Sequence, residues 1–293
     1  MEMISRRHFA LGACCGALVP AFGLGAALAA DHLADDFARI ERESGGRLGV
    51  AVADPQSKAQ WAYRADERFP ICSTFKLIAV GAVLARVDAG KEQLARRIRF
   101  EPRDVVVGSP VTKDHAGGAG MTLDELCVAA MTMSDNTAGN LLLGAIGGPI
   151  GLTDFAASLG DTMTRLDRIE PALNEALPGD LRDTTSPAAM VGNLRALIFG
   201  DALSFESRTR LVGWLIENKT GNARLRAGLP ANWRVGDKTG SGERGTTNDV
   251  AIVWPGRRPP LLVAVYLTGT TAVAAQRDAA IAAVGRAIAA ALV

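Results

Sequence analysis

The chain is long enough to bury a sizeable core, and its charges are balanced. It has 293 residues, 48% of them hydrophobic and 22% charged, as in a globular protein with one large domain or two small ones. Its 32 Lys and Arg residues nearly cancel 31 Asp and Glu residues, with no basic stripe or acidic tail. This balance predicts a mixed-charge surface and gives no electrostatic basis for nucleic-acid binding.

Residues 1–30 are predicted to be an export signal. The twin-arginine pattern Ser5-Arg6-Arg7-His8-Phe9-Ala10 precedes an apolar run that closes with the cleavage pattern Ala27-Leu28-Ala29. A retained membrane anchor is the alternative, because the run approaches the length of a span. The small residues and Pro20 favour a removed signal. We therefore expect export by the twin-arginine route, a periplasmic or secreted protein, and no membrane contact after removal of the signal.

Two cysteines, Cys72 and Cys127, lie outside this signal. They do not form a disulfide framework, and no metal-ligand spacing surrounds either of them. An oxidising compartment would permit a bridge between them, but we expect two buried free thiols. No metal or organic cofactor is implied.

The predicted elements surround a helical middle with strands and helices from both chain ends. Helices are expected over residues 32–44 and 274–292, with a mainly helical stretch from 75 to 215 between them. Strands are expected over residues 48–53, 60–63, 234–238, 249–254 and 261–267.

This order predicts an α+β (α/β-α) fold: an antiparallel sheet flanked by N- and C-terminal helices, with an inserted all-helical lobe. Residues 31–293 would form a single catalytic domain. Its α/β lobe would comprise residues 31–68 and 216–293, and its helical lobe residues 69–215. The cleft between the lobes is the expected site for a small molecule.

Histidine is too scarce for the commonest hydrolase sites. Only His8, His32 and His115 occur, the first within the signal and the second beside its end. Neither a Gly-x-Ser-x-Gly elbow nor a His-Glu-x-x-His motif is present, which disfavours Ser-His-Asp and zinc hydrolases. A hydrolase built on this sequence would use Lys or Glu as its base.

Ser73-Thr74-Phe75-Lys76 supplies a candidate nucleophile and base. The following apolar run predicts a helix that begins near Ser73, so Ser73 and Lys76 would share a face. The helix N-terminus would favour an alkoxide on the serine, and desolvation would lower the pKa of the lysine. Alone the motif is weak, since it arises roughly once by chance in a chain of this length.

Two more motifs strengthen the assignment. Ser134-Asp135-Asn136 follows a helical stretch, and Lys238-Thr239-Gly240 ends a predicted strand. Each would occur by chance in only about one chain in twenty. The ordered trio resembles the penicillin-recognising serine acyltransferases, and within them the class A β-lactamases. The likeness covers essentially the whole mature chain, including Ser109-Pro110-Val111-Thr112, Arg165-x-Asp167-Arg168-x-Glu170-Pro171-x-x-Asn174 and Gly245-Thr246-Thr247-Asn248-Asp249.

The resemblance implies a role for each motif. Ser73 would be the nucleophile, with the backbone N–H groups of Ser73 and Ser241 as the oxyanion hole. Lys76, or Glu170 through a water, would deprotonate Ser73, and which of them acts is disputed for the family. Ser134 would protonate the leaving ring nitrogen.

The resemblance also implies how the substrate is held. Asn136 would bind the side-chain amide of a β-lactam. Lys238 and Thr239, helped by Arg224, would bind its carboxylate, alongside Gly240 and Ser241 of the same strand. The expected partners are small β-lactams, and the expected state is a monomer.

Glu170 and Asn174 distinguish a hydrolase from a receptor, since they would activate the water that releases the acyl-enzyme. The family's loop over residues 165–183 carries both, commonly closed by an ion pair, here Arg168 with Asp183. A D,D-peptidase or penicillin-binding protein would share the serine and lysine motifs but leave Glu170 and Asn174 unexplained. A non-catalytic β-lactam sensor would require a signalling domain for which the chain has no room.

Several positions depart from the family pattern. Thr247 stands where many members carry a carboxylate-binding arginine, and Gly108 where an aromatic often lines the cleft. Cys72 and Ser241 resemble members with broadened cephalosporin or carbapenem activity. However, Gly242 replaces the cysteine that carbapenemases bond to the equivalent of Cys72. Val80 likewise leaves Cys127 without the partner it has in some narrow-spectrum members.

Overall fold

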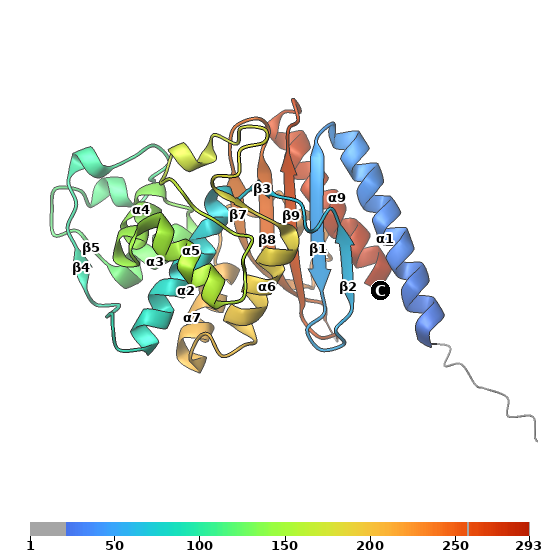
Figure 1. The fold of residues 1–293 in the computed structure, drawn as a ribbon, viewed down its shortest axis with the longest axis horizontal. Coiled ribbons are helices and arrows are strands. Elements are labelled where there is room, and N and C mark those ends of the chain that lie inside the picture. Colours follow the sequence, from blue (N-terminus) through green and yellow to red (C-terminus); the bar gives the residue numbers. More distant parts are fainter. Residues whose placement is uncertain (1–21, 257, 293) are drawn as a thin grey trace, which may run out of the picture.

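A five-stranded antiparallel sheet forms the centre of the molecule (Figure 1). The structure, a computed structural model, describes residues 22–256 and 258–292. The order of the strands is β2-β1-β9-β8-β7. Their bounds are Arg47–Ala53 (β1), Gln60–Tyr63 (β2), Arg234–Ser241 (β7), Thr247–Trp254 (β8) and Leu261–Thr268 (β9). Strands from the two chain ends therefore pair directly, as the sequence predicts, through β1 and β9.

The two terminal helices cover one face of this sheet (Figure 1). Helix α1 is Phe22–Ser44 and helix α9 is Ala274–Leu292. Leu33, Phe37 and Ile40 of α1 are at most 1% exposed, and their spacing gives one apolar stripe. Helix α1 begins ten residues before the expected residue 32 because the Ala- and Leu-rich end of the predicted signal also favours a helix. The twin-arginine motif lies outside the described residues.

The other face of the sheet is covered by α6 (Pro187–Ile198), with α7 (Phe205–Ile216) against β7. From the sequence, both helices are expected in the helical lobe. Strands β8 and β9 are buried along nearly their whole length, so both of their faces require a cover. Two-residue strands, β3 (Phe69–Pro70) and β6 (Thr184–Thr185), pair beside this layer.

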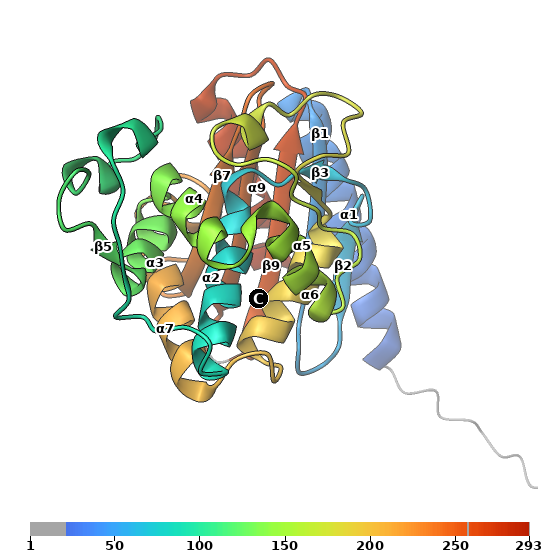
Figure 2. The same cartoon turned by 60° about the vertical axis from the view of Figure 1, so that its left-hand side comes forward.

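The helical lobe is built around α2, which is buried from Phe75 to Leu84 and, apart from Lys76, is apolar over that stretch. Figure 2 shows the neighbouring helices around it. The elements of this part are α2 (Phe75–Asp88), β4 (Arg97–Ile98), β5 (Met121–Thr122), α3 (Leu123–Thr132), α4 (Asn136–Ala145) and α5 (Gly148–Ser158). The short helix α8 (Leu225–Gly228) instead lies against α9.

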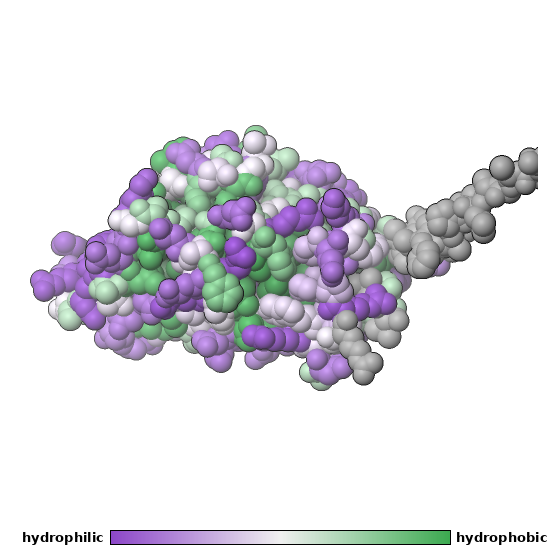
Figure 3. Space-filling model, turned by 90° about the horizontal axis from the view of Figure 1, so that it is seen from below, coloured by the Kyte–Doolittle hydropathy of each residue, from purple (hydrophilic) through white to green (hydrophobic). Residues whose placement is uncertain are grey.

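Hydrophilic and hydrophobic side chains are unevenly distributed over the surface. Seen from below, hydrophilic side chains dominate the end formed by the helical lobe, and hydrophobic ones gather near the middle (Figure 3).

Among the described residues, no single helix has the length and hydropathy of a membrane span. Only α4 and α5 taken together reach them, and that pair is bent by 73°.

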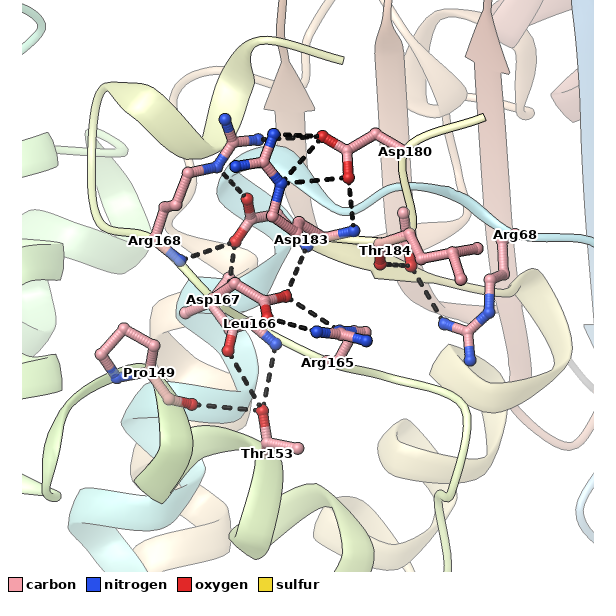
Figure 4. A network of polar contacts seen from close by, with 12 residues as sticks. Arg68, Pro149, Thr153, Arg165, Leu166, Asp167, Arg168, Asp180, Asp183 and Thr184 are labelled. Atoms are coloured by element: carbon pink, nitrogen blue, oxygen red, sulfur yellow. Dashed lines mark hydrogen bonds and ion pairs between the residues drawn. The ribbon is translucent and has the colours of Figure 1, made fainter. Parts of the chain in front are cut away.

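Residues 165–183 form a long loop, named here the Glu170 loop, and a buried carboxylate closes it (Figure 4). Asp183 is 1% exposed and accepts a hydrogen bond from Arg168 Nε at 2.6 Å. Its Oδ1 also accepts from the backbone N–H groups of Asp167 and Arg168, at 2.8 and 2.9 Å. The ion pair expected between Arg168 and Asp183 is therefore present, and it joins the two ends of the loop.

Replacing Asp183 by Asn is expected to lower the free energy of unfolding by about 2–3 kcal/mol, because three donors would lose a charged acceptor. Urea unfolding at neutral pH measures this loss. Asp180→Asn is the matched control, because Asp180 pairs with the exposed Arg182 at 2.7 Å. Surface pairs contribute little, so equal losses in the two variants would contradict the anchoring role of Asp183.

Candidate active site

The predicted site residues converge on a cleft of about 500 Å³ between the helical lobe and the sheet. Six segments form it: the turn before α2, the loop at residues 108–110, the segment that leads into α4, the Glu170 loop, the segment before α8, and the end of β7. Its lining residues are Ser73, Gly108, Pro110, Met133, Ser134, Asn136, Asn174, Thr220, Arg224, Thr239, Gly240 and Ser241. The other three predicted residues, Lys76, Glu170 and Lys238, lie buried directly behind this lining.

Ser73 lies in a 3₁₀ turn, Cys72–Thr74, that leads into α2. The regular helix begins two residues later than the expected start near Ser73. Cys72 has a φ of 45°, which costs a non-glycine residue free energy and persists only where its surroundings enforce it. Here the sheet holds the turn, since Asn248 Nδ2 of β8 donates to the Pro70 carbonyl at 2.9 Å. Ser73 is left 7% exposed, at the floor of the cleft.

Lys76 connects Ser73 to two other parts of the site. Its Nζ donates to Ser73 Oγ at 2.8 Å, Glu170 Oε1 at 2.9 Å and Asn136 Oδ1 at 2.7 Å. The Ser134 carbonyl oxygen lies within 2.9 Å of the same atom. An ammonium has three N–H groups for these four acceptors. At any moment one of the four acceptors therefore receives no hydrogen bond from Lys76. A rotation of the ammonium group changes which acceptor this is without moving any heavy atom.

Ser73 and Glu170 are in direct contact. Ser73 Oγ donates to Glu170 Oε1 at 3.0 Å, so the bridging water expected from the sequence analysis is not needed for this contact. Lys76 explains the close approach, because it contacts both oxygens and draws them to one point. Burial lowers the pKa of the Lys76 ammonium, and the carboxylate of Glu170 opposes that shift.

Ser134 and Lys238 form a second buried pair across the cleft. Lys238 Nζ donates to Ser134 Oγ at 2.9 Å and to the Thr239 carbonyl at 2.7 Å. Burial, followed by repulsion from Lys76, lowers the pKa of Lys238 well below its usual range. Because Ser134 Oγ accepts from Lys238, its own hydroxyl proton can point into the cleft.

Glu170 and Asn174 face each other across one turn of the Glu170 loop, next to a cis Glu170–Pro171 peptide bond. Asn174 Nδ2 donates to Glu170 Oε2 in a short hydrogen bond. Asn174 Oδ1 is buried and has no hydrogen-bond partner among the described residues. A buried acceptor of this kind requires a donor, and a water beside Glu170 would supply one.

Arg224 is held against the sheet and is not a free surface cation. Its side chain is 11% exposed and pairs with Asp278 at 2.8 Å. Its Nη1 donates to the carbonyls of Gly240 and Asn248, at 2.8 and 2.7 Å. Its Nη2 donates to Ser241 Oγ at 2.7 Å, at the edge of the cleft. The guanidinium therefore lies where a carboxylate bound along β7 would meet it.

Of the positions that depart from the family pattern, Gly108 and Ser241 line the cleft, and Cys127 lies in the hydrophobic core. Cys72 and Cys127 are free and buried, as the sequence analysis predicts. A Cβ at Gly242 would approach Cys72 Sγ to 2.7 Å, so glycine here leaves room for the thiol. Gly108 has a φ of 82°, and a Cβ there would lie 2.7 Å from Asn136 Nδ2. A side chain at position 108 would therefore require a change of backbone conformation.

Two residues position the site without having been assigned a role from the sequence: Asn140, and Asp135 of the Ser134-Asp135-Asn136 motif. Asn140 pairs with the backbone of Glu170: its Oδ1 accepts from the Glu170 N–H at 2.9 Å, and its Nδ2 donates to the Glu170 carbonyl at 3.0 Å. Asp135 is fully buried and accepts from the N–H groups of Val111 and Thr112, both at 2.9 Å. The only sequence signal for Asn140 was its place one helical turn after Asn136.

Beneath β7 lies a buried pair of carboxyl groups, Asp237 and Asp249. The register of β7 and β8 puts both on one face of the sheet. Asp237 accepts from Arg226 Nε at 2.6 Å and from Asn218 Nδ2 at 2.9 Å. Within residues 22–256 and 258–292, the one hydrogen-bond donor to the Asp249 side chain is the Leu225 N–H, at 3.1 Å. Burial, and then repulsion from Asp237, raise the pKa of Asp249 well above its usual range.

The chain is similar to known proteins over most of its length. Residues 32–292 match the model of the beta-lactamase enzyme family. The chain is 50% identical over 239 residues to Beta-lactamase OXY-1 of Klebsiella oxytoca, and 49% identical over 239 residues to Beta-lactamase CTX-M-8 of Citrobacter amalonaticus. Both alignments cover 82% of each chain. An ancestral class A beta-lactamase (GNCA) superposes with a TM-score of 0.87 and 61% identity, covering 89% of this chain and all of the other.

Replacing Asp249 by Asn is expected to change how stability depends on pH. Because the pKa of Asp249 is raised in the folded protein, folding is accompanied by proton uptake at pH values above 3.8, the usual pKa of an aspartate. Wild-type stability should then fall as pH rises above that value, until the folded group ionises, by up to about 1.4 kcal/mol per pH unit for one proton. Asn mimics the protonated carboxyl and removes this contribution. Urea unfolding of both proteins between about pH 4 and pH 8 tests this, and parallel stability curves would contradict it.

Proposed function

We propose that this protein opens penicillins and cephalosporins through an acyl-enzyme on Ser73. The premise is its family: the chain belongs to the class A β-lactamases, hydrolyses β-lactams and confers resistance to them. The observation that carries this proposal is the contact of Ser73 Oγ with both Lys76 Nζ and Glu170 Oε1, at 2.8 and 3.0 Å. A serine hydroxyl needs an adjacent base to become a nucleophile, and here two groups lie in reach.

Acylation begins when Ser73 Oγ attacks the β-lactam carbonyl carbon. Its proton passes to Glu170 or Lys76; Glu170 accepts it directly, and Lys76 can accept it only in its neutral form, which burial favours. The carbonyl oxygen becomes an oxyanion held by the backbone N–H groups of Ser73 and Ser241. Removing one such donor typically costs about 2.7–4 kcal/mol of transition-state stabilisation.

The ring then opens as the C–N bond breaks. Ser134 is placed to donate its hydroxyl proton to the leaving nitrogen, because its oxygen already accepts from Lys238 at 2.9 Å. The proton returns to Ser134 from the group that deprotonated Ser73, through the buried contacts of Lys76. The product of this step is an ester between Ser73 and the opened substrate.

Deacylation requires a water on the side of Glu170. Glu170 and the buried Asn174 Oδ1 would orient it: the carboxylate takes one proton from the water, and the amide oxygen accepts a hydrogen bond from the O–H group that remains. The hydroxide then attacks the ester carbon, the C–O bond to Ser73 breaks, and Ser73 regains its proton. Asn140 supports this step by fixing the backbone of Glu170.

Substrate recognition uses the opposite wall of the cleft. Asn136 Nδ2, which donates to the Val107 carbonyl at 2.8 Å, is placed to hold the side-chain amide of the substrate. The substrate carboxylate would be bound by two cationic side chains, Lys238 and Arg224, and by the hydroxyl group of Thr239. The position of Gly240 and Ser241 at the end of β7 lets the substrate lie along the strand.

We also propose that the protein is exported by the twin-arginine route to the periplasm or the medium, where its substrates are met, and acts there as a monomer. The motif at residues 5–10 supports the route. The near-neutral charge of the chain supports a small-molecule partner over nucleic acid.

Glu170→Ala is expected to acylate but to release product at least about 10²-fold more slowly, since a general base contributes roughly 10²–10⁴-fold. Intact mass spectrometry during incubation with a penicillin should show the acyl adduct accumulating. Glu175→Ala removes a carboxylate from the same loop without touching the cleft, and it should return to its starting mass. Ordinary turnover by Glu170→Ala would contradict the assigned role.

Arg224→Ala is expected to raise KM for penicillins about tenfold, because a charge-assisted contact to the carboxylate is lost. Steady-state kinetics measure this effect, and urea unfolding confirms that the variant is folded. Arg210→Ala serves as the control, since Arg210 lies on α7 and pairs with Asp124 and Glu206. Unchanged KM in folded Arg224→Ala would leave Arg224 with a structural role alone.

A further inference from the structure

A second cavity, of about 580 Å³, lies behind the Glu170 loop. Its walls are the loop segment 176–181, the turn that leads into β1, the end of β9 and the residues around Arg68. Among the described residues, it shares no lining residue with the cleft that holds Ser73. Its volume lies within the range of small-molecule sites, roughly 300–1,000 Å³. Nothing in the proposed reaction uses it.

The wall of this cavity is rich in arginine. Four arginines line it against two carboxylates, Glu41 and Asp180. Three of the four are in ion pairs: Arg47 with Glu67 at 2.9 Å, Arg64 with Glu41 at 2.8 Å, and Arg244 with Glu243 at 3.0 Å. Asp180 is itself paired with Arg182.

Arg68, the fourth arginine, has no carboxylate partner among the described residues. Its Nη1 donates instead to two neutral oxygens, the Met163 carbonyl at 2.6 Å and Thr184 Oγ1 at 3.0 Å. Figure 4 shows Arg68 reaching Thr184 from outside the Glu170 loop. These contacts fix the guanidinium without neutralising it. A partly buried, positioned and unneutralised guanidinium is a group that an anion can bind with little rearrangement.

The loop side of the cavity is the segment that directly follows Asn174. The Glu243 N–H donates to the Asn174 carbonyl at 2.9 Å, and Arg244 Nη1 donates to the Glu175 carbonyl. Arg244 lines the cavity while its neighbour holds Asn174. A molecule in the cavity would therefore contact the same short stretch of chain that positions the deacylating water.

We propose that this cavity is a second binding site, for a small organic polyanion such as a di- or tricarboxylate. Arg68 would bind one anionic group as a bidentate partner. Arg244 would lie within the same cavity for another, because its ion pair with Glu243 is exposed to solvent and contributes little. Pro70, Leu177 and Pro178 also line the cavity and would pack against a short carbon skeleton. This apolar part selects an organic anion over an inorganic one.

Leu181 offers a test that removes no hydrogen bond. Its side chain lines the cavity, and Leu181 is 56% exposed. Its carbonyl accepts from Thr184 Oγ1, which is its one hydrogen bond to the part of the chain that the structure describes. Leu181→Glu would place a negative charge in the cavity, and Leu181→Gln is the neutral control of the same shape. In calorimetric titration of the mature protein, citrate should bind the wild type and Leu181→Gln, and bind Leu181→Glu at least tenfold more weakly.

The cleft is also cationic, so the binding must be located. Citrate binding should persist in Arg224→Ala, and hydrogen exchange should slow at the amides of residues 176–181 when citrate is bound. Inorganic phosphate should bind more weakly than citrate. The proposal is overturned if Leu181→Glu and Leu181→Gln bind citrate alike, if Arg224→Ala abolishes binding, if phosphate equals citrate, or if no binding occurs up to about 10 mM citrate. None of these outcomes depends on β-lactam turnover.

Discussion

The burial of the Lys76 ammonium is the constraint on which the rest of this structure depends. A fully buried charge is costly unless charged and polar partners surround it. Those partners come from three separate parts of the chain: Ser73 from the turn before α2, Asn136 from the start of α4, and Glu170 from the long loop. The helical lobe and the Glu170 loop must therefore close together around one nitrogen. The contact of Ser73 with both Lys76 and Glu170 is a consequence of that closure.

The sheet also contains buried charged groups, and these lower the stability of the protein. Lys238 is a second buried ammonium, and beneath its strand the carboxyl groups of Asp237 and Asp249 are crowded together. A core of aliphatic residues would be more stable at these positions. Strands β8 and β9, buried on both faces, provide the packing that offsets these charges. The positive φ of Cys72 also costs free energy, and the hydrogen bond from Asn248 of β8 to the Pro70 carbonyl holds that turn in place.

Much of the fold and the chemistry could be predicted from the sequence, because the motifs are local and the residue types are diagnostic. Ser73, Ser134 and Lys238 each lie in a short motif at a helix or strand end. What escaped prediction depends on tertiary contacts: Asn140 beneath Glu170, α6 against the sheet, and the direct Ser73–Glu170 contact. Periodicity reports which face of a helix is apolar, but it does not report which layer covers that face. The early start of α1 escaped because helix propensity does not distinguish an export signal from a helix.

The Glu170 loop has two faces, and its position is determined from both. On the cleft side, Lys76 and Asn140 hold Glu170. On the far side, Glu243 holds the carbonyl of Asn174, and Asp183 ties the ends of the loop together. Catalytic geometry tolerates errors of only about 1 Å before rates fall by roughly 10²-fold. Residues on the far side of the loop, although they do not line the cleft, therefore help to fix the position of Glu170 beside Ser73.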